Sequence, residues 1–114
     1  MRECMFCRIR DGRAPAQIVH RDEHCIGFKD IRPKAPAHVL FIPLKHIATL
    51  NDLSPEDSEL IGRLVVAATQ YAKQLGYAEQ GYRFVWNCNG DAGQTIFHIH
   101  LHLLAGRPMG WPPG

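Results

Sequence analysis

The sequence predicts an α+β fold: a mostly antiparallel sheet with one long helix and a short N-terminal helix. Two observations lead to this prediction. Short apolar runs typical of strands come in neighbouring groups, and a segment with helical spacing of apolar residues, 54–76, separates them. The last two runs, residues 82–87 and 96–104, are joined by a loop, which favours antiparallel pairing of these two strands.

The first half of the chain supplies the short helix and three of the predicted strands. Residues 4–10 are expected to form the helix, which ends at Asp11-Gly12. Residues 16–20 and 25–28 carry strand-like apolar stretches, the second ending at Asp30. Residues 38–43 form a near-continuous apolar run, which predicts a strand at the centre of the sheet.

The long helix has a clear predicted start and end. Ser54 can cap it, Pro55 fits the first helical position, and acidic residues follow in the first turn. Gly76 is a natural stop. The apolar residues at helical spacing between them are Leu60, Ile61, Leu64, Val65, Ala68, Tyr71, Ala72 and Leu75.

Composition bounds the class of protein. The chain has 114 residues, 46% hydrophobic and 21% charged, so we expect a single domain over residues 1–114 with a short proline-rich tail at 106–114. A net charge of +2 gives no reason to expect nucleic-acid or membrane binding, and no apolar run has the length of a membrane span. No apolar signal segment follows Met1, so the expected location is the cytoplasm, where the four cysteines should be thiols.

Three histidines alternate with apolar residues near the end of the chain: His98, His100 and His102. In a strand, one face would carry the three imidazoles and the other face the apolar side chains between them. Folding does not call for such a row, although surface or hydrogen-bonded core histidines are the simpler interpretation. Two chemical interpretations stay open: a metal site, and nucleophilic catalysis by imidazole on a phosphoryl or nucleotidyl group.

The loop before this row has features of a phosphate-binding loop. Gly90 and Gly93 permit positive φ and close backbone approach, and exposed N–H groups there can hold phosphate oxygens. Asn87, Gln94 and Thr95 add neutral donors. A plain hairpin turn is the alternative, but the position directly before the histidines favours a role in binding.

These residues together resemble the histidine-triad (HIT) family. The likeness covers nearly the whole chain and includes residues 28–31, 35–38, 41–47, 93–95, the 98–104 run and the tail 106–114. The tail is similar to that of the Hint branch, the purine nucleoside phosphoramidases. The resemblance implies the HIT α+β fold and a homodimer with a continuous sheet. It also implies cofactor-free hydrolysis of purine nucleoside 5′-phosphoramidates, conjugates of AMP or GMP, through a nucleotidyl-histidine intermediate.

The same resemblance implies roles for individual residues. His100 would be the nucleophile, His102 would contact the phosphate and the departing group, and His38 would orient His100 from behind. On sequence alone, His38 also fits a hydrogen-bonded core histidine and Asp30 an ordinary turn residue. The nucleotide-binding residues would be Asp30 and Ile31 for the ribose, Asn87, Gly93, Gln94 and Thr95 for phosphate and leaving-group atoms, Phe6, Ile18 and Phe28 for the purine, and Trp111 near the partner's site.

The pair Cys4 and Cys7 departs from the Hint pattern, although some bacterial HIT proteins carry such a pair. In those, Cys4, Cys7, His46 and His98 would match a structural zinc site, and two thiolates with two imidazoles suit tetrahedral zinc. One alternative is a pair of buried thiols with His98 only hydrogen-bonded. The other is a redox pair, which lacks the βαβ context that such motifs require.

Three other functions fit parts of the pattern. A dinucleoside polyphosphate hydrolase of the same superfamily would share the histidines, but the Trp-Pro-Pro-Gly ending argues against it. A nucleotide-binding adaptor would bind without turnover. A zinc hydrolase would use the triad itself as ligands and would lose activity on chelation.

Overall fold

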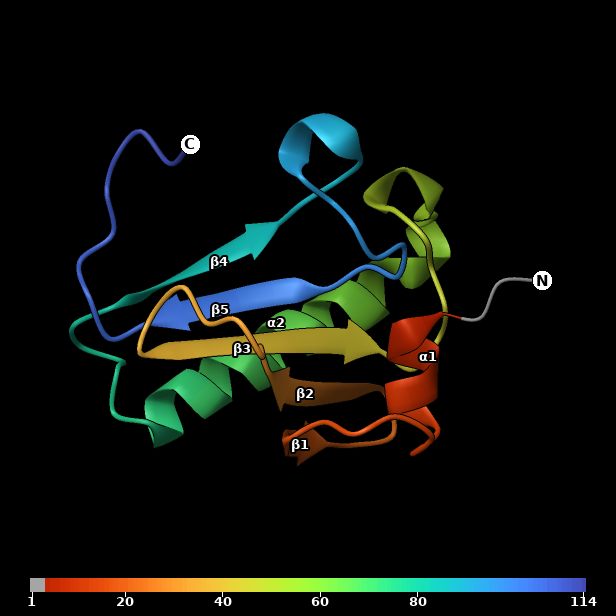
Figure 1. Cartoon of the computed structure of the whole chain (residues 1–114), viewed down its shortest axis with the longest axis horizontal. Helices are drawn as coiled ribbons and strands as arrows, with labels where there is room; N and C mark the ends of the chain where they lie inside the picture. Colours follow the sequence, from red (N-terminus) through yellow and green to blue (C-terminus); the bar gives the residue numbers. More distant parts are fainter. Residues whose placement is uncertain (1–3) are drawn as a thin grey trace.

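The computed structural model describes residues 4–114 and contains a five-stranded antiparallel sheet in the order β1-β2-β3-β5-β4 (Figure 1). The strands are β1 (Ile18–Arg21), β2 (Cys25–Lys29), β3 (Ala37–Pro43), β4 (Tyr82–Trp86) and β5 (Leu101–Ala105), and the helices are α1 (Met5–Arg10) and α2 (Ser58–Gln74). The predicted α+β class, the central position of β3 and the antiparallel pairing of β4 with β5 are confirmed. None of the helices in residues 4–114 is both long and apolar enough to cross a membrane.

The long helix starts later than predicted. Pro55–Asp57 forms a separate 3-10 turn, and α2 begins at Ser58. Ser54 is the N-cap of this turn and Pro55 is near its start, as predicted. In the capping box, the Asp57 carboxylate accepts hydrogen bonds from the Ser54 backbone N–H at 3.0 Å and from Ser54 Oγ at 3.3 Å. Lys45 Nζ also donates to Asp57, at 2.8 Å. The predicted cap is therefore present, and its first turn is a 3-10 turn that directly precedes α2.

Two apolar layers lie on opposite faces of the sheet. Side chains alternate along β3, so Val39 and Phe41 pack toward α2, whereas Leu40 and Ile42 pack with α1 residues on the other face. Figure 1 shows α2 lying across one face of the sheet, with α1 at one end of β2 and β3. The second face is covered only in part, and there the functional side chains gather.

The three histidines do not form the predicted row on one strand. The strand β5 begins only at Leu101, so His98 and His100 lie in the irregular segment before it. The backbone of this segment is held elsewhere, because the Ile99 N–H donates to Ile47 O at 2.8 Å. The expectation of a strand over residues 96–104 was therefore wrong at its first part, and the imidazoles separate into two sites.

The pairing of β3 with β5 brings two of the predicted site residues together. Leu40 lies opposite His102, and His38 lies opposite Leu104. His38 and His102 are thus diagonal neighbours on the sheet face away from α2. Leu101 and Leu103 point to the opposite face, where they are fully buried in the core.

Candidate active site and metal cluster

A pocket of about 720 Å³ lies on the sheet face away from α2, bounded by α1, β2, β3, β5 and the loops next to them. It collects most of the residues that the sequence predicted for a nucleotide site. These are Phe6, Phe28, Asp30, Ile31, Asn87, Gly93, Thr95, His100 and His102. An aromatic and aliphatic wall with a few polar groups at one end is typical of a small-molecule site.

Gln94 lies behind this pocket and supports its loop. Its side chain is buried, and Nε2 donates to Ala48 O at 2.9 Å and to Ile96 O at 3.1 Å. Its Oε1 accepts from the Asn89 backbone N–H at 2.8 Å. Gln94 therefore holds the loop that carries Gly93 and Thr95, and it does not line the pocket.

Two further predicted residues lie outside the pocket. Ile18 is 39% exposed on β1, and Trp111 is 82% exposed on the tail. Several lining residues were not predicted from the sequence. Of these, Lys29 and Arg32 bring positive charge next to Asp30, and their nearness to Asp30 in the sequence could have indicated them. The other missed lining residues are Met5, Arg8, Ile9, Ala14, Pro15, Ala16, Leu40 and Ile96.

His100 presents one free ring nitrogen to the pocket. Its Nδ1 lies 2.8 Å from His98 O, and because a carbonyl can only accept, Nδ1 carries the hydrogen and donates. Nε2 then holds a lone pair. Burial lowers the pKa of His100, so the ring is neutral near pH 7. This is the protonation state that a nucleophilic imidazole requires.

A hydrogen-bonded chain also sets the tautomers of His38 and His102. The Lys34 backbone N–H donates to His38 Nδ1 at 3.0 Å, so the hydrogen of neutral His38 is on Nε2. That Nε2 lies 2.9 Å from His102 Nδ1 and 3.4 Å from Asp30 Oδ2. His102 Nδ1 is therefore an acceptor, and its hydrogen is on Nε2.

Burial keeps this pair of imidazoles neutral. Burial is the largest cause that lowers the pKa of His38, which Asp30 opposes and Lys34 reinforces. Burial, followed by the charges of His100 and His38, lowers the pKa of His102 to about 4. A proton added to His38 or His102 would have to sit on the nitrogen that already accepts a hydrogen bond from an N–H group. The hydrogen-bond geometry therefore disfavours the charged rings, as the lowered pKa values do.

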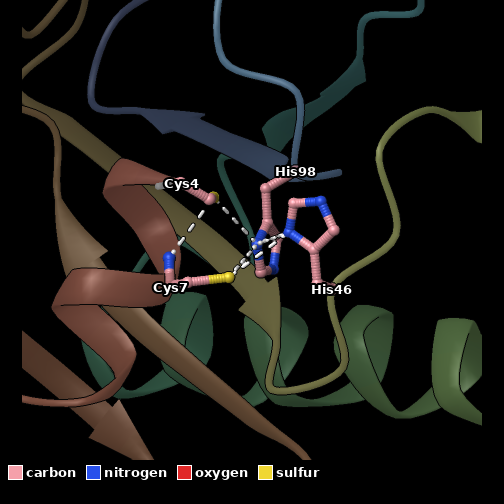
Figure 2. Close-up of side chains that lie close together, drawn as sticks. All are labelled: Cys4, Cys7, His46 and His98. Carbon is pink, nitrogen blue, oxygen red and sulfur yellow. Dashed lines mark hydrogen bonds between the residues drawn. The ribbon is translucent and has the colours of Figure 1, made fainter. Parts of the chain in front are cut away.

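A second cluster lies at the other end of the histidine segment. Figure 2 shows Cys4, Cys7, His46 and His98 converging, with their ligand atoms all within 4.8 Å of one another. His98 Nδ1 is 3.4 Å from Cys4 Sγ, 3.6 Å from Cys7 Sγ and 3.2 Å from His46 Nδ1. His98 Nε2 donates to Pro43 O at 2.9 Å, so Nδ1 directs a lone pair into the cluster.

These separations fit a tetrahedral metal ion. In a tetrahedral site, nitrogen ligands lie ~2.0 Å and sulfur ligands ~2.3 Å from the metal ion. Two such ligand atoms are then roughly 3.3–3.8 Å from each other. Burial, followed by the hydrogen bond and charge of Cys4, raises the pKa of the Cys7 thiol. A bound cation would displace that proton. The four predicted ligands are therefore brought together in an arrangement that can hold a metal.

His20, Asp22 and Cys25 form another group of three potential metal ligands, but hydrogen bonds in the turn between β1 and β2 explain why they lie together. Asp22 Oδ1 accepts from the backbone N–H groups of His24 and Cys25, at 2.7 and 2.9 Å. Asp22 Oδ2 lies 2.6 Å from His20 Nε2. Both oxygens of the Asp22 carboxylate thus take part in hydrogen bonds that close the turn between β1 and β2.

Comparisons with known proteins find relatives over nearly the whole chain. The sequence model of the HIT domain matches residues 11–109. Purine nucleoside phosphoramidase of Escherichia coli K12 is 44% identical over 108 residues, which cover 95% of this chain and 91% of the relative. A HIT family hydrolase from Legionella pneumophila is 51% identical with a TM-score of 0.97, covering 98% of this chain and all of the other. A zinc-bound histidine triad family protein from Mycobacterium smegmatis is 36% identical with a TM-score of 0.79, covering 91% of this chain and 75% of the other.

The neutral state of His102 makes stability depend on pH. An unfolded histidine titrates near pH ~6.5, whereas folded His102 has a pKa of about 4, so the unfolded chain binds the proton first on acidification. The free energy of unfolding should therefore fall between about pH 6.5 and 4. We expect His102→Gln to flatten this slope in urea unfolding, with His24→Gln on the exposed turn as control. Equal slopes for all three proteins would contradict the burial of a neutral ring.

Proposed function

Because this chain belongs to the HIT domain family, we propose that it is a hydrolase that cleaves the P–N bond of purine nucleoside 5′-phosphoramidates. The products are a nucleoside monophosphate and an amine. The observation that carries the proposal is the state of His100, a neutral ring with Nδ1 bound to a carbonyl and Nε2 free in a nucleotide-sized pocket. The identity to a purine nucleoside phosphoramidase supports the substrate class.

The pocket offers a place for each part of such a substrate. Phe6 and Phe28, whose ring centroids are 5.3 Å apart, provide an apolar wall for the purine. Asp30 at the rim can accept hydrogen bonds from the ribose hydroxyls, next to Ile31. At the other end, the loop residues Asn87, Gly93 and Thr95 lie where donors can meet phosphate oxygens, and Gln94 supports that loop.

In the first step, His100 Nε2 forms a bond to phosphorus while the P–N bond breaks, and the departing nitrogen takes a proton from solvent and leaves as the amine. The Nδ1–H to His98 O bond stabilises the positive charge that the ring gains. His102 Nε2–H donates to the phosphoryl or departing group, because His102 Nδ1 is already occupied by His38. The sequence led to the expectation that His38 orients His100, but its ring contacts His102 instead, so we propose that His38 acts through His102 and orients that ring. The intermediate is a nucleotide bonded to His100.

In the second step, water attacks phosphorus, the bond to His100 breaks, and the remaining proton of the water returns to solvent. Over the two steps one water molecule is consumed. In the products, the amine nitrogen carries one added hydrogen and phosphorus carries the hydroxyl group. His100 returns to its neutral state with Nε2 free. Every reacting group in this route belongs to the chain, the substrate or water, so we expect turnover without a metal or organic cofactor at phosphorus.

Replacing the nucleophile tests the chemistry directly. We expect His100→Ala to bind AMP with wild-type affinity, to lose the nucleotidyl adduct in mass spectrometry of acid-quenched reactions, and to lose about 10³-fold or more of kcat. His24→Ala, outside the pocket, is the matched control and should keep both. Wild-type turnover by His100→Ala would refute the assignment. Nucleotide binding without turnover by the wild-type protein would favour a nucleotide-binding adaptor.

We propose that Cys4, Cys7, His46 and His98 hold a structural zinc ion. The distances within the cluster and the lone pair of His98 Nδ1 support this, as does the zinc-bound family member. The ion would tie α1 to the segments that follow β3 and precede β5, and it would supply only cross-linking of the chain. The backbone that carries His98 O is also held by the Ile99 N–H bond to Ile47 O, which needs no metal.

Removing the metal distinguishes a structural role of the zinc ion from a catalytic role. We expect a zinc chelator to lower Tm by several degrees, and we expect turnover measured well below Tm to persist. Cys7→Ser should lose stoichiometric zinc in elemental analysis and show the lower Tm without chelator. Cys88→Ser, outside the cluster, should retain zinc. Loss of turnover in chelated, still-folded protein, with recovery on adding zinc, would instead support a zinc hydrolase.

We also propose that two chains form a dimer with a continuous sheet, acting in the cytoplasm, where thiols stay reduced. The strand β4 is at the edge of the sheet, and in residues 4–114 no strand pairs with its outer side. An edge strand with unpaired backbone groups favours pairing with a second copy. We propose that the exposed Trp111 on the tail reaches the site of the partner in this dimer.

The dimer makes two measurable predictions. Sedimentation velocity should give about twice the 12.9 kDa mass of one chain. Trp111→Ala should remain dimeric but change the ratio of kcat/KM between bulky and small amine leaving groups, because Trp111 lines the neighbouring site. A monomeric mass at all concentrations would exclude the dimer, and an unchanged ratio would exclude Trp111 from the site.

A further inference from the structure

The C-terminal tail is fastened to the loop between β2 and β3 by one arginine. Arg107 donates two hydrogen bonds to Lys34 O, from Nε at 3.1 Å and from Nη2 at 2.9 Å. Its third contact, from Nη1 to Pro108 O at 3.0 Å, keeps the guanidinium oriented. Seventy-three residues of sequence separate Arg107 from Lys34, so this contact links two distant parts of the chain.

Close packing beside this contact shows that it is built into the fold. Gly106 has φ +100°, and a β-carbon there would lie 2.8 Å from Pro36 Cβ. Only glycine lets the chain leave β5 at this angle and pass so close to the loop. The position of Arg107 against Lys34 therefore follows from the backbone at Gly106.

Lys34 is also the residue that sets the tautomer of His38. Its carbonyl receives the two bonds from Arg107, and its N–H donates to His38 Nδ1 at 3.0 Å. His38 Nε2 in turn donates to His102 Nδ1 at 2.9 Å. A continuous series of hydrogen bonds thus runs from the exposed tail to the ring that faces the departing group.

We propose that Arg107 is a positioning residue for catalysis: by holding Lys34 it keeps His38 in the Nε2–H tautomer, and it thereby keeps the Nε2–H of His102 directed into the pocket. Without Arg107, Lys34 is free to turn its N–H away, and His38 can then carry its hydrogen on Nδ1. His38 would no longer donate to His102, and His102 could present a bare nitrogen to the substrate. The effect on turnover rests on the proposed function, whereas the tautomer is a property of the free protein.

The test compares Arg107→Met with the wild-type protein by two independent readouts. In ¹⁵N-histidine NMR of the substrate-free protein, His38 should show a bare Nδ1 and a protonated Nε2 in the wild type, and a mixture of both tautomers in Arg107→Met. With phosphoramidate substrate, kcat should fall ~3- to 10-fold, about the factor of one hydrogen bond, while KM changes less than about twofold. Arg107→Lys keeps one donor and should lie between the two proteins in both readouts.

Arg83→Met is the matched control, because Arg83 Nη2 donates to Gly110 O of the same tail at 2.9 Å but does not contact Lys34. It should leave the His38 signals unchanged. Wild-type His38 nitrogens in both Arg107 variants, or the same tautomer mixture in Arg83→Met, would overturn the proposal. If Arg107→Met does not fold, Arg107→Lys decides by the same criteria. If wild-type protein turned over no phosphoramidate, the proposed function would fail, and the NMR comparison would still decide the role of Arg107.

Discussion

The register of β3 against β5 is the constraint on which the rest of the site depends. Leu101 and Leu103 are fully buried against α2, and the two-residue period of a strand then directs His102 to the opposite face. The same register places His38 two positions from the residue opposite His102, within hydrogen-bond distance. A slip by one residue would bury His102 in the apolar core and expose two leucines, so the energy of core packing also positions the polar pair.

In each imidazole of the site, one ring nitrogen is hydrogen-bonded to a neighbouring group of the chain that either only donates or only accepts there. His100 donates to a backbone carbonyl, His38 accepts from a backbone N–H, and His102 accepts from His38. Backbone groups cannot change their protonation state, so the tautomers follow from main-chain geometry. Burial then disfavours the charged forms. The proposed nucleophile and the proposed donor are thus distinguished by their partners, although both are histidines.

Much of this arrangement could be predicted from the sequence, and the remainder shows where periodicity fails. A near-continuous apolar run predicted β3 as the central strand, because a strand buried on both faces carries apolar residues at successive positions. Apolar alternation overestimated the length of β5, because residues 96–100 are diverted by long-range hydrogen bonds that have no local sequence pattern. The capping pattern at Ser54 correctly marked the start of a helical turn, but it does not reveal that this turn has 3-10 geometry and that α2 begins only at Ser58. The link from Arg107 to Lys34 left no sequence signal.

His98 contributes to two sites through different chemical groups. Its imidazole belongs to the cysteine cluster, whereas its main-chain oxygen accepts the hydrogen bond of His100. Any amino acid at this position would still offer that oxygen. A change of the side chain at position 98 therefore dismantles the cluster alone, while the carbonyl that fixes the ring of His100 stays in the main chain.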